Sequence, residues 1–248
     1  MTLQAAVQPA FQSNSYLEGR PHAWAPDFPL AGPWPLEHTP LAWSEVWHKL
    51  VTAQIRYRAA MWTDGKCIVV FRSSSATHRQ FTLSIREQNV LLRTLRGDRQ
   101  KVIANESRIA ASTVANCLKN AMQKLGFQTR LDAAPLAALI LNNSEPVRAE
   151  RANCSVFSAT EADYILASVP RPDWSSFEEV TKSERQIASL IVEGKTNTEI
   201  ATIRETSVHT VENQVAALFR KLDASGRFDL LRVLYRSAPE VQAPTVYS

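Results

Sequence analysis

Polar side chains occupy one face of the segment 207–222 at a spacing that suits contact with nucleic-acid bases. Val211, Val215 and Leu218 recur every three or four residues, which indicates a helix with one buried face. The opposite face offers hydroxyl, imidazole, amide and guanidinium groups, which can hydrogen-bond to base edges or phosphates. We therefore predict DNA contacts from Ser207, His209, Thr210, Asn213, Arg220 and Lys221.

The residues around this segment predict the helices that must hold it. The segments 181–184 and 196–199 both have the Thr-x-x-Glu spacing of a capping box, so a helix should begin at each. Ser207 should cap the third helix, and the leucines at 230–234 indicate a fourth. Two short helices joined by a tight turn, the second with a polar face, describe a helix-turn-helix. Its second helix can enter the major groove of DNA.

The stretch 181–227 resembles the LuxR/GerE-type domain of bacterial transcription regulators. The resemblance implies a four-helix unit that binds double-stranded DNA, works with the transcription machinery and often dimerises through its fourth helix. Another four-helix unit with similar caps is the alternative. The residues that carry the resemblance are Glu184, Gly194, Asn197, Glu199, Ile200, Ala201, Ser207, Thr210, Val211, Lys221, Leu222 and Arg227.

The same pattern occurs a second time, 97 residues earlier in the chain. The segment 84–87 repeats the capping box, and Gly97 takes the position of Gly194. A fixed offset across so many positions indicates a second, more diverged copy of the same domain. Its predicted DNA contacts are Ser112, Thr113, Asn116, Lys119, Gln123 and Lys101.

The two copies differ in charge. The segment 84–130 holds nine Lys or Arg and three acids, a net charge of +6, whereas 181–227 holds seven and six, a net of +1. Members of the resembled family usually carry Lys or Arg near the positions of Glu212 and Ala216. Because phosphate neutralisation supplies most non-specific affinity, we expect the first copy to bind DNA more strongly. Its basic residues could alternatively form an ordinary solvated face.

The first copy also departs from the pattern in two places. Ala110 stands where the second copy has its capping serine, which should cost ~1 kcal/mol of helix stability. Pro135 should delay the fourth helix.

The remaining sequence predicts a small β-hairpin before each copy. Apolar alternation over 55–61 and a near-continuous apolar run over 67–71, joined by Asp64-Gly65, indicate a hairpin at about 55–72. The offset of 97 residues places strand-like sequence at 164–169, with 153–158 as the incoming strand. A short amphipathic helix is expected over 43–50.

We therefore expect a mostly α protein with two tandem tetrahelical helix-turn-helix domains, each preceded by a β-hairpin. The segment 1–41 holds 7 of the 13 prolines and should form an extended arm, whose aromatic residues either stay free or dock on the folded body or a partner. The domain ranges are 42–141 and 145–238, joined near 142–146, and 239–248 is a polar tail.

The composition narrows the possible functions. A net charge of +4 permits nucleic acid as a partner, and three cysteines without metal-type spacing fit a reduced, cytoplasmic setting. The absence of an apolar run near 18 residues predicts no membrane span. The five histidines lack ligand spacing, and no phosphate loop or catalytic triad pattern is present, so we expect no cofactor, no metal and no enzymatic activity.

The predicted function is sequence-specific DNA binding and transcription control, with the chain acting as a homodimer or as an intramolecular pseudo-dimer. The alternative is a non-enzymatic interaction protein in which one copy is a dimerisation or partner-docking module that modulates another regulator.

Overall fold

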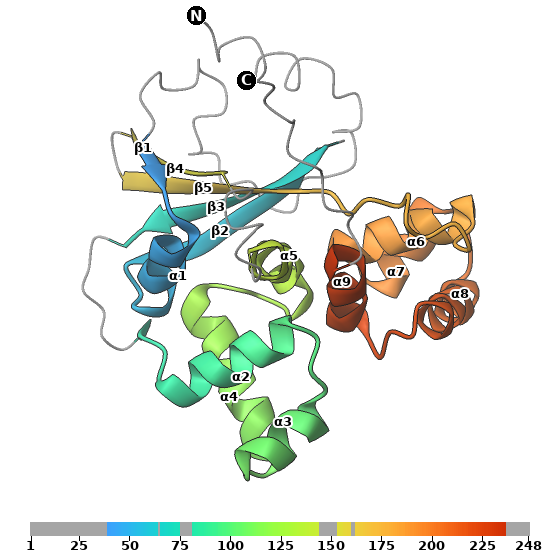
Figure 1. Ribbon diagram of the computed structural model, residues 1–248, viewed down its shortest axis with the longest axis horizontal. Coiled ribbons are helices and arrows are strands. Elements are labelled where there is room, and N and C mark those ends of the chain that lie inside the picture. Colours follow the sequence, from blue (N-terminus) through green and yellow to red (C-terminus); the bar gives the residue numbers. More distant parts are fainter. Residues whose placement is uncertain (1–38, 64, 75–80, 144–152, 160–161, 237–248) are drawn as a thin grey trace, which may run out of the picture. The chain divides into compact units, whose positions relative to one another are not determined.

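The computed structural model describes residues 39–63, 65–74, 81–143, 153–159 and 162–236 (Figure 1). Within them, the chain alternates a small β portion with a group of helices, twice. The elements of the first half are β1 Thr39–Leu41, α1 Trp43–Val51, β2 Ile55–Trp62, β3 Lys66–Ser73, α2 Ile85–Leu95, α3 Gln100–Ser107, α4 Ala111–Leu125 and α5 Ala134–Asn142. Those of the second half are β4 Asn153–Ala159, β5 Ala162–Pro170, α6 Lys182–Val192, α7 Asn197–Ile203, α8 Val208–Lys221 and α9 Arg227–Arg236.

Both predicted hairpins are confirmed, and they join into one antiparallel sheet. The strand order is β1-β4-β5-β3-β2 (Figure 1), so the second strands of the two hairpins pair at the centre. The segment 39–41, which falls in the predicted arm, forms β1 at the sheet edge beside β4. Segments 1–38 and 239–248, the turn residues Asp64 and Glu161, and junction residues 144–146 lie outside the described residues.

The register between β3 and β5 relates the two hairpins by a local pseudo-two-fold axis. Val69 pairs with Ala167 and Val70 with Leu166. Because the repeat offset is 97 residues, Ala167 is the counterpart of Val70, and Leu166 is the counterpart of Val69. Each central residue of one hairpin therefore lies opposite the counterpart of its neighbour, as in a symmetric dimer.

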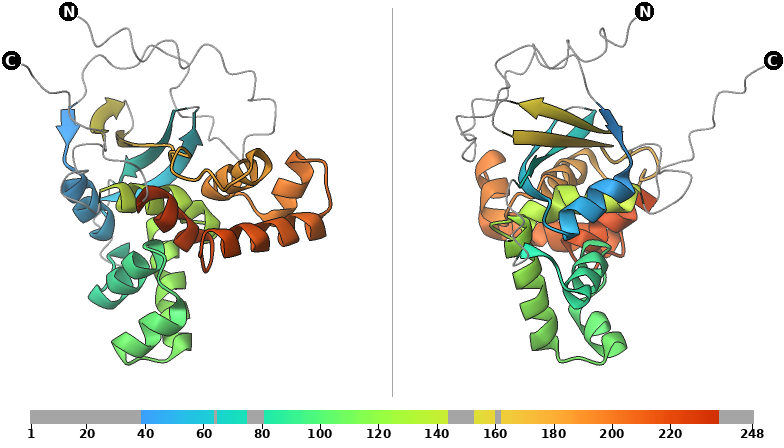
Figure 2. Two further views of the ribbon diagram at one scale, coloured as in Figure 1. Left: turned by 45° about the vertical axis from the view of Figure 1, so that its right-hand side comes forward. Right: turned by 90° about the vertical axis from the view of Figure 1, so that its left-hand side faces the viewer.

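The inner face of the sheet belongs to the main hydrophobic core. Cys67, Val69 and Phe71 point to this face with 0% of their surface exposed, because alternate residues of a strand share one side. Helices α1 and α5 contact the sheet and lie on the same side of it in the two views of Figure 2. Leu136 and Leu139 of α5 are fully buried, and each such leucine contributes roughly 1.5–3 kcal/mol to stability.

The helices begin where the capping residues predict. Ser84 and Thr181 each accept a hydrogen bond from the backbone N–H three residues later, and the glutamates at those positions bond back. Thr196 and Glu199 repeat the arrangement at α7. The fourth helices differ as expected from Pro135: α9 begins at Arg227, whereas its counterpart Arg130 precedes a 3-10 turn and α5 begins at Ala134.

Candidate nucleic-acid interface

The third helix of each half, α4 and α8, has one buried and one exposed face. In α8, Val211, Val215 and Leu218 are at most 7% exposed. The corresponding buried residues of α4 are Val114, Leu118, Ala121, Met122 and Leu125. In both helices, the face opposite these buried residues is turned to solvent, as the sequence predicts.

The structure leaves the predicted contact residues of the first half largely free on the surface. Thr113 is half-buried, and the exposed residues are Ser112, Asn116, Lys119, Gln123 and Lys101. Lys101 lies on α3, and the others follow α4 along one side. The set therefore spans both helices of the helix-turn-helix.

In the second half, several predicted contact residues also bond within the protein. The exposed residues are Ser207, His209, Thr210, Asn213, Arg220 and Lys221. The Ser207 hydroxyl accepts from the Thr210 backbone N–H at 3.0 Å and lies 2.8 Å from the Thr210 hydroxyl. His209 Nε2 and Asn213 Nδ2 are 3.3 Å apart. These contacts hold the first turns of α8 in one orientation.

The helix cap is the clearest local difference between α4 and α8. Ala110 has the extended backbone of an N-cap residue but forms no side-chain cap, whereas Ser207 does. Restoring a hydroxyl in Ala110→Ser should stabilise the chain by ~1 kcal/mol, and Ser207→Ala should destabilise it by a similar amount. Urea unfolding of the two variants measures this. A shift of the same sign in both would contradict the cap assignment.

A lysine near the end of each third helix fastens that helix to the first. Lys221 donates to the Glu184 carboxylate at 2.7 Å and to the Glu179 carbonyl at 3.2 Å. Its counterpart Lys124 donates to Glu87 at 2.8 Å and to the Thr82 carbonyl at 3.2 Å. Lys221 therefore serves the fold as well as any DNA contact, which the sequence pattern did not reveal.

The electrostatics of these anchors favour the charged carboxylates. The Lys221 hydrogen bond, with help from Thr181, lowers the pKa of Glu184 to about 2. Burial opposes the same effect at Glu87, but hydrogen bonds from Lys124 and Ser84 still hold its pKa below the ordinary value. Both ion pairs are therefore intact at neutral pH, and α4 and α8 are anchored to the rest of the protein in the same way.

Arg204 is a positioning residue that the sequence did not single out. Its guanidinium donates to Gln214 on α8 at 3.0 Å and to the Ser183 hydroxyl on α6 at 2.8 Å. The counterpart in the first half is Ser107, so comparison of the repeats carried no signal for this contact. Arg204 therefore braces the second recognition helix by a means that the first half lacks.

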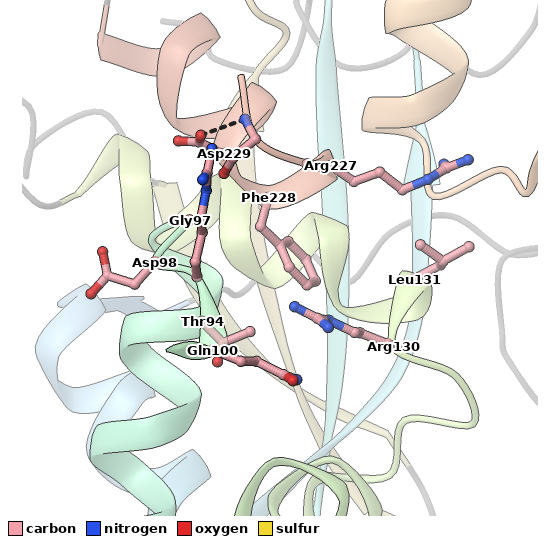
Figure 3. Close-up of a pocket in the computed structure, with 12 residues that line it drawn as sticks. Thr94, Gly97, Asp98, Gln100, Arg130, Leu131, Arg227, Phe228 and Asp229 are labelled. Atoms are coloured by element: carbon pink, nitrogen blue, oxygen red, sulfur yellow. Dashed lines mark hydrogen bonds between the residues drawn. The ribbon is translucent and has the colours of Figure 1, made fainter. Parts of the chain in front are cut away.

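The fourth helices α5 and α9 pack against one another, and Leu131 just before α5 and Asp229 within α9 approach the opposite half. A Cβ at Gly97 would lie 2.9 Å from Asp229 Cα, and a Cβ at Gly194 would lie 2.8 Å from the Leu131 carbonyl. Figure 3 shows Gly97 beside Asp229, whose carboxylate accepts from the Ser225 N–H at 2.7 Å. Since Gly97 and Gly194 are counterparts, the two halves meet through reciprocal contacts.

A cation–π contact also crosses this junction. The Arg130 guanidinium lies 5.3 Å from the centre of the Phe228 ring, and both residues line the pocket shown in Figure 3. The counterpart of Arg130 is Arg227, which instead donates to the Lys195 carbonyl and, at 2.6 Å, to Asn197. The arginine that the two copies share at this position thus makes different contacts in each half.

Comparison with protein families agrees with this repeat. The family described as bacterial regulatory proteins, luxR family, matches the chain twice, at residues 81–137 and 178–234. The chain carries two LuxR-type units in tandem. Neither a curated protein nor a solved structure matches it.

The first LuxR-type unit contains α2 to α5 and the second contains α6 to α9. Helices α4 and α8 are the third helices of the two units, which the sequence predicts to be the recognition helices. The family description names bacterial regulatory proteins. Among the described residues, no group of three His, Cys, Asp or Glu could hold a metal ion, and no helix is long and apolar enough to span a membrane.

Proposed function

We propose that this chain regulates transcription by binding an operator in double-stranded DNA as a single-chain pseudo-dimer. The two LuxR-type units supply two recognition helices, one for each half of the operator. The observation that carries the proposal is the pseudo-two-fold relation between the halves, seen in the β3–β5 register and in the reciprocal approaches of Gly97 and Gly194. A homodimer of chains with one unit each would reach the same arrangement only after two chains associate.

This symmetry favours an inverted repeat as the operator. Two recognition helices related by a two-fold axis read half-sites of opposite direction, commonly about one helical turn apart. Helices α5 and α9, which lie where members of this family often dimerise, are already packed against one another within the chain. No second chain is therefore needed to pair the two units.

The charge distribution supports a leading role for the first unit. Its net charge of +6 over 84–130 exceeds the +1 of 181–227. Lys119 lies exposed on α4, at the position where α8 has Ala216. Release of counterions by such cations supplies much of the affinity for DNA.

Replacing Lys119 tests which unit leads. Lys119→Ala should weaken binding more than Ala216→Lys strengthens it, because it removes a cation from the more basic unit. Fluorescence anisotropy with labelled duplex at several salt concentrations measures both effects. Lys66→Ala, at the exposed start of β3, is the charge-matched control. Equal affinity of wild type and Lys119→Ala would refute the leading role.

The alternative function is partner docking by the second unit. The observation that favours it is the exposed pair Glu212 and Ala216 on α8, since a carboxylate repels phosphates and alanine offers no positive charge. An unbiased DNA-selection assay with the full chain at two salt concentrations separates the two functions. Enrichment of an inverted repeat with a steep salt dependence supports DNA regulation. No enrichment, or binding insensitive to salt, supports docking.

A further inference from the structure

The recognition helices α4 and α8 hold their counterpart side chains in matching positions. Lys124 and Lys221 anchor the ends of the two helices to counterpart carbonyl and carboxylate groups. The hydrogen bonds to the carboxylates measure 2.8 and 2.7 Å, and those to the backbone carbonyls measure 3.2 Å in both. Each helix also buries the same stripe of positions. A difference in side chain at matching positions is therefore a difference in the group that each helix presents to solvent at that position.

The exposed faces share some residues and differ in others. Asn116 has its counterpart in Asn213, so both units present an amide at that position, and an amide suits adenine. One position earlier, Ala115 corresponds to Glu212. Three positions after Asn116, Lys119 corresponds to Ala216.

The two charged members of these pairs are available for contact with DNA. Lys119 and Glu212 are both exposed. Within the part of the chain that the structure describes, neither one takes part in an ion pair or a side-chain hydrogen bond, unlike Lys221 and Arg204 nearby. Their groups are therefore not committed to holding the fold.

We propose that this pair of differences makes the two halves of the operator unequal, with Lys119 selecting guanine in one half and Glu212 selecting cytosine in the other. A lysine ammonium donates to guanine O6 and N7, whereas a glutamate carboxylate accepts from the cytosine N4 amine. Alanine at each counterpart position imposes neither hydrogen bond. The shared asparagines keep a common adenine in both halves. The proposal rests on the DNA-binding function proposed above.

The test uses two variants of the full chain, each of which gives one unit the pair of residues found in the other. In Glu212→Ala/Ala216→Lys, the second recognition helix receives the pair of residues found in the first. DNA selection should then yield an operator in which one half loses its cytosine preference and gains a guanine, while the other half is unchanged. Each such contact should change affinity by roughly 5- to 150-fold between the preferred and the substituted base.

In the reverse variant, Ala115→Glu/Lys119→Ala, the half read by the first unit should lose its guanine and gain a cytosine, while the other half keeps its own cytosine. Glu178→Lys replaces an exposed carboxylate that precedes α6 with an ammonium group, and it matches the +2 change in net charge of Glu212→Ala/Ala216→Lys. It should leave both halves of the selected operator as in wild type. Changes in both halves for one exchange, or in neither, would overturn the assignment of Lys119 and Glu212.

The two proposals fail in distinguishable ways. A wild-type chain that enriches no sequence at either salt concentration overturns the DNA-binding function, and the half-site assignment with it. A wild-type chain that enriches an inverted repeat with two identical halves leaves DNA binding supported but overturns the assignment. Enrichment of unequal halves that follow the exchanged residues supports both.

Discussion

Gly97→Ala should unfold at a clearly lower urea concentration than wild type, with a loss of at least ~2 kcal/mol. The left-handed conformation of Gly97, with φ of +96°, costs an alanine roughly 1–2 kcal/mol. In addition, the new Cβ would lie 2.9 Å from Asp229 Cα, which is backbone of the opposite LuxR-type unit and cannot rotate away. Gly194→Ala should behave alike, because its Cβ meets the Leu131 carbonyl at 2.8 Å.

Two other glycines provide matched controls for this result. Gly226 has no atom within 4 Å of an added Cβ, so Gly226→Ala should be close to neutral. Gly126 also has a left-handed backbone, with φ of +94°, but its Cβ would meet Tyr57 within the first half, so Gly126→Ala measures strain without the junction. Equal unfolding midpoints for Gly97→Ala and Gly226→Ala would contradict the close packing of the two units.

Inserting about five base pairs between the two halves of the selected operator should weaken binding by about 100-fold or more. The insertion turns one half-site by roughly half a helical turn, so two recognition helices in fixed relation cannot engage both halves. The chain then loses the gain that comes from making the second contact intramolecular, which reaches 10²- to 10⁴-fold for linked binding modules. Anisotropy titration of the two duplexes measures the ratio.

A second insertion of about ten base pairs, a full helical turn, completes the experiment. It returns both half-sites to the same face of the duplex but leaves them further apart. Units packed through α5 and α9 should bind this duplex almost as poorly as the half-turn duplex. Recovery of affinity with the full-turn insertion would mean that the units move independently, and would contradict the fixed junction.

Much of the fold was predictable because its signals are local. The capping boxes at 84–87, 181–184 and 196–199 each lie within four residues of chain, and all three form as expected. The missing cap at Ala110 and the later start of α5, which has Pro135 in its first turn, follow from single residues as well. The match of the LuxR family to both copies confirms the tandem reading of the 97-residue repeat.

The joining of the two hairpins into one sheet was not predictable from the same patterns. Pairing of Val69 with Ala167 depends on contacts between residues far apart in the chain, and each hairpin alone would show the same alternation. The junction glycines illustrate the same limit. Gly97 and Gly194 predict helix ends from the sequence, but only the structure places Asp229 and Leu131 against them.

At the candidate interface, the sequence predicts the exposed helix faces but not the contacts that anchor the helices. The exposed faces of α4 and α8 follow from helical periodicity, so the positions of Asn116 and Asn213 were predictable. The anchoring of Lys221 to Glu184 was not, because the partner lies 37 residues earlier on another helix. The variants that exchange Lys119 and Glu212 between the units test which exposed residues meet bases.

The stoichiometry of the protein–operator complex tests the central claim most directly. Sedimentation of the full chain with a labelled duplex that holds the selected inverted repeat gives the number of chains per duplex, and footprinting of the same sample gives the extent of protection. A single-chain pseudo-dimer predicts one chain per duplex with both half-sites protected. Two chains per duplex, or one chain that protects a single half-site, would contradict it.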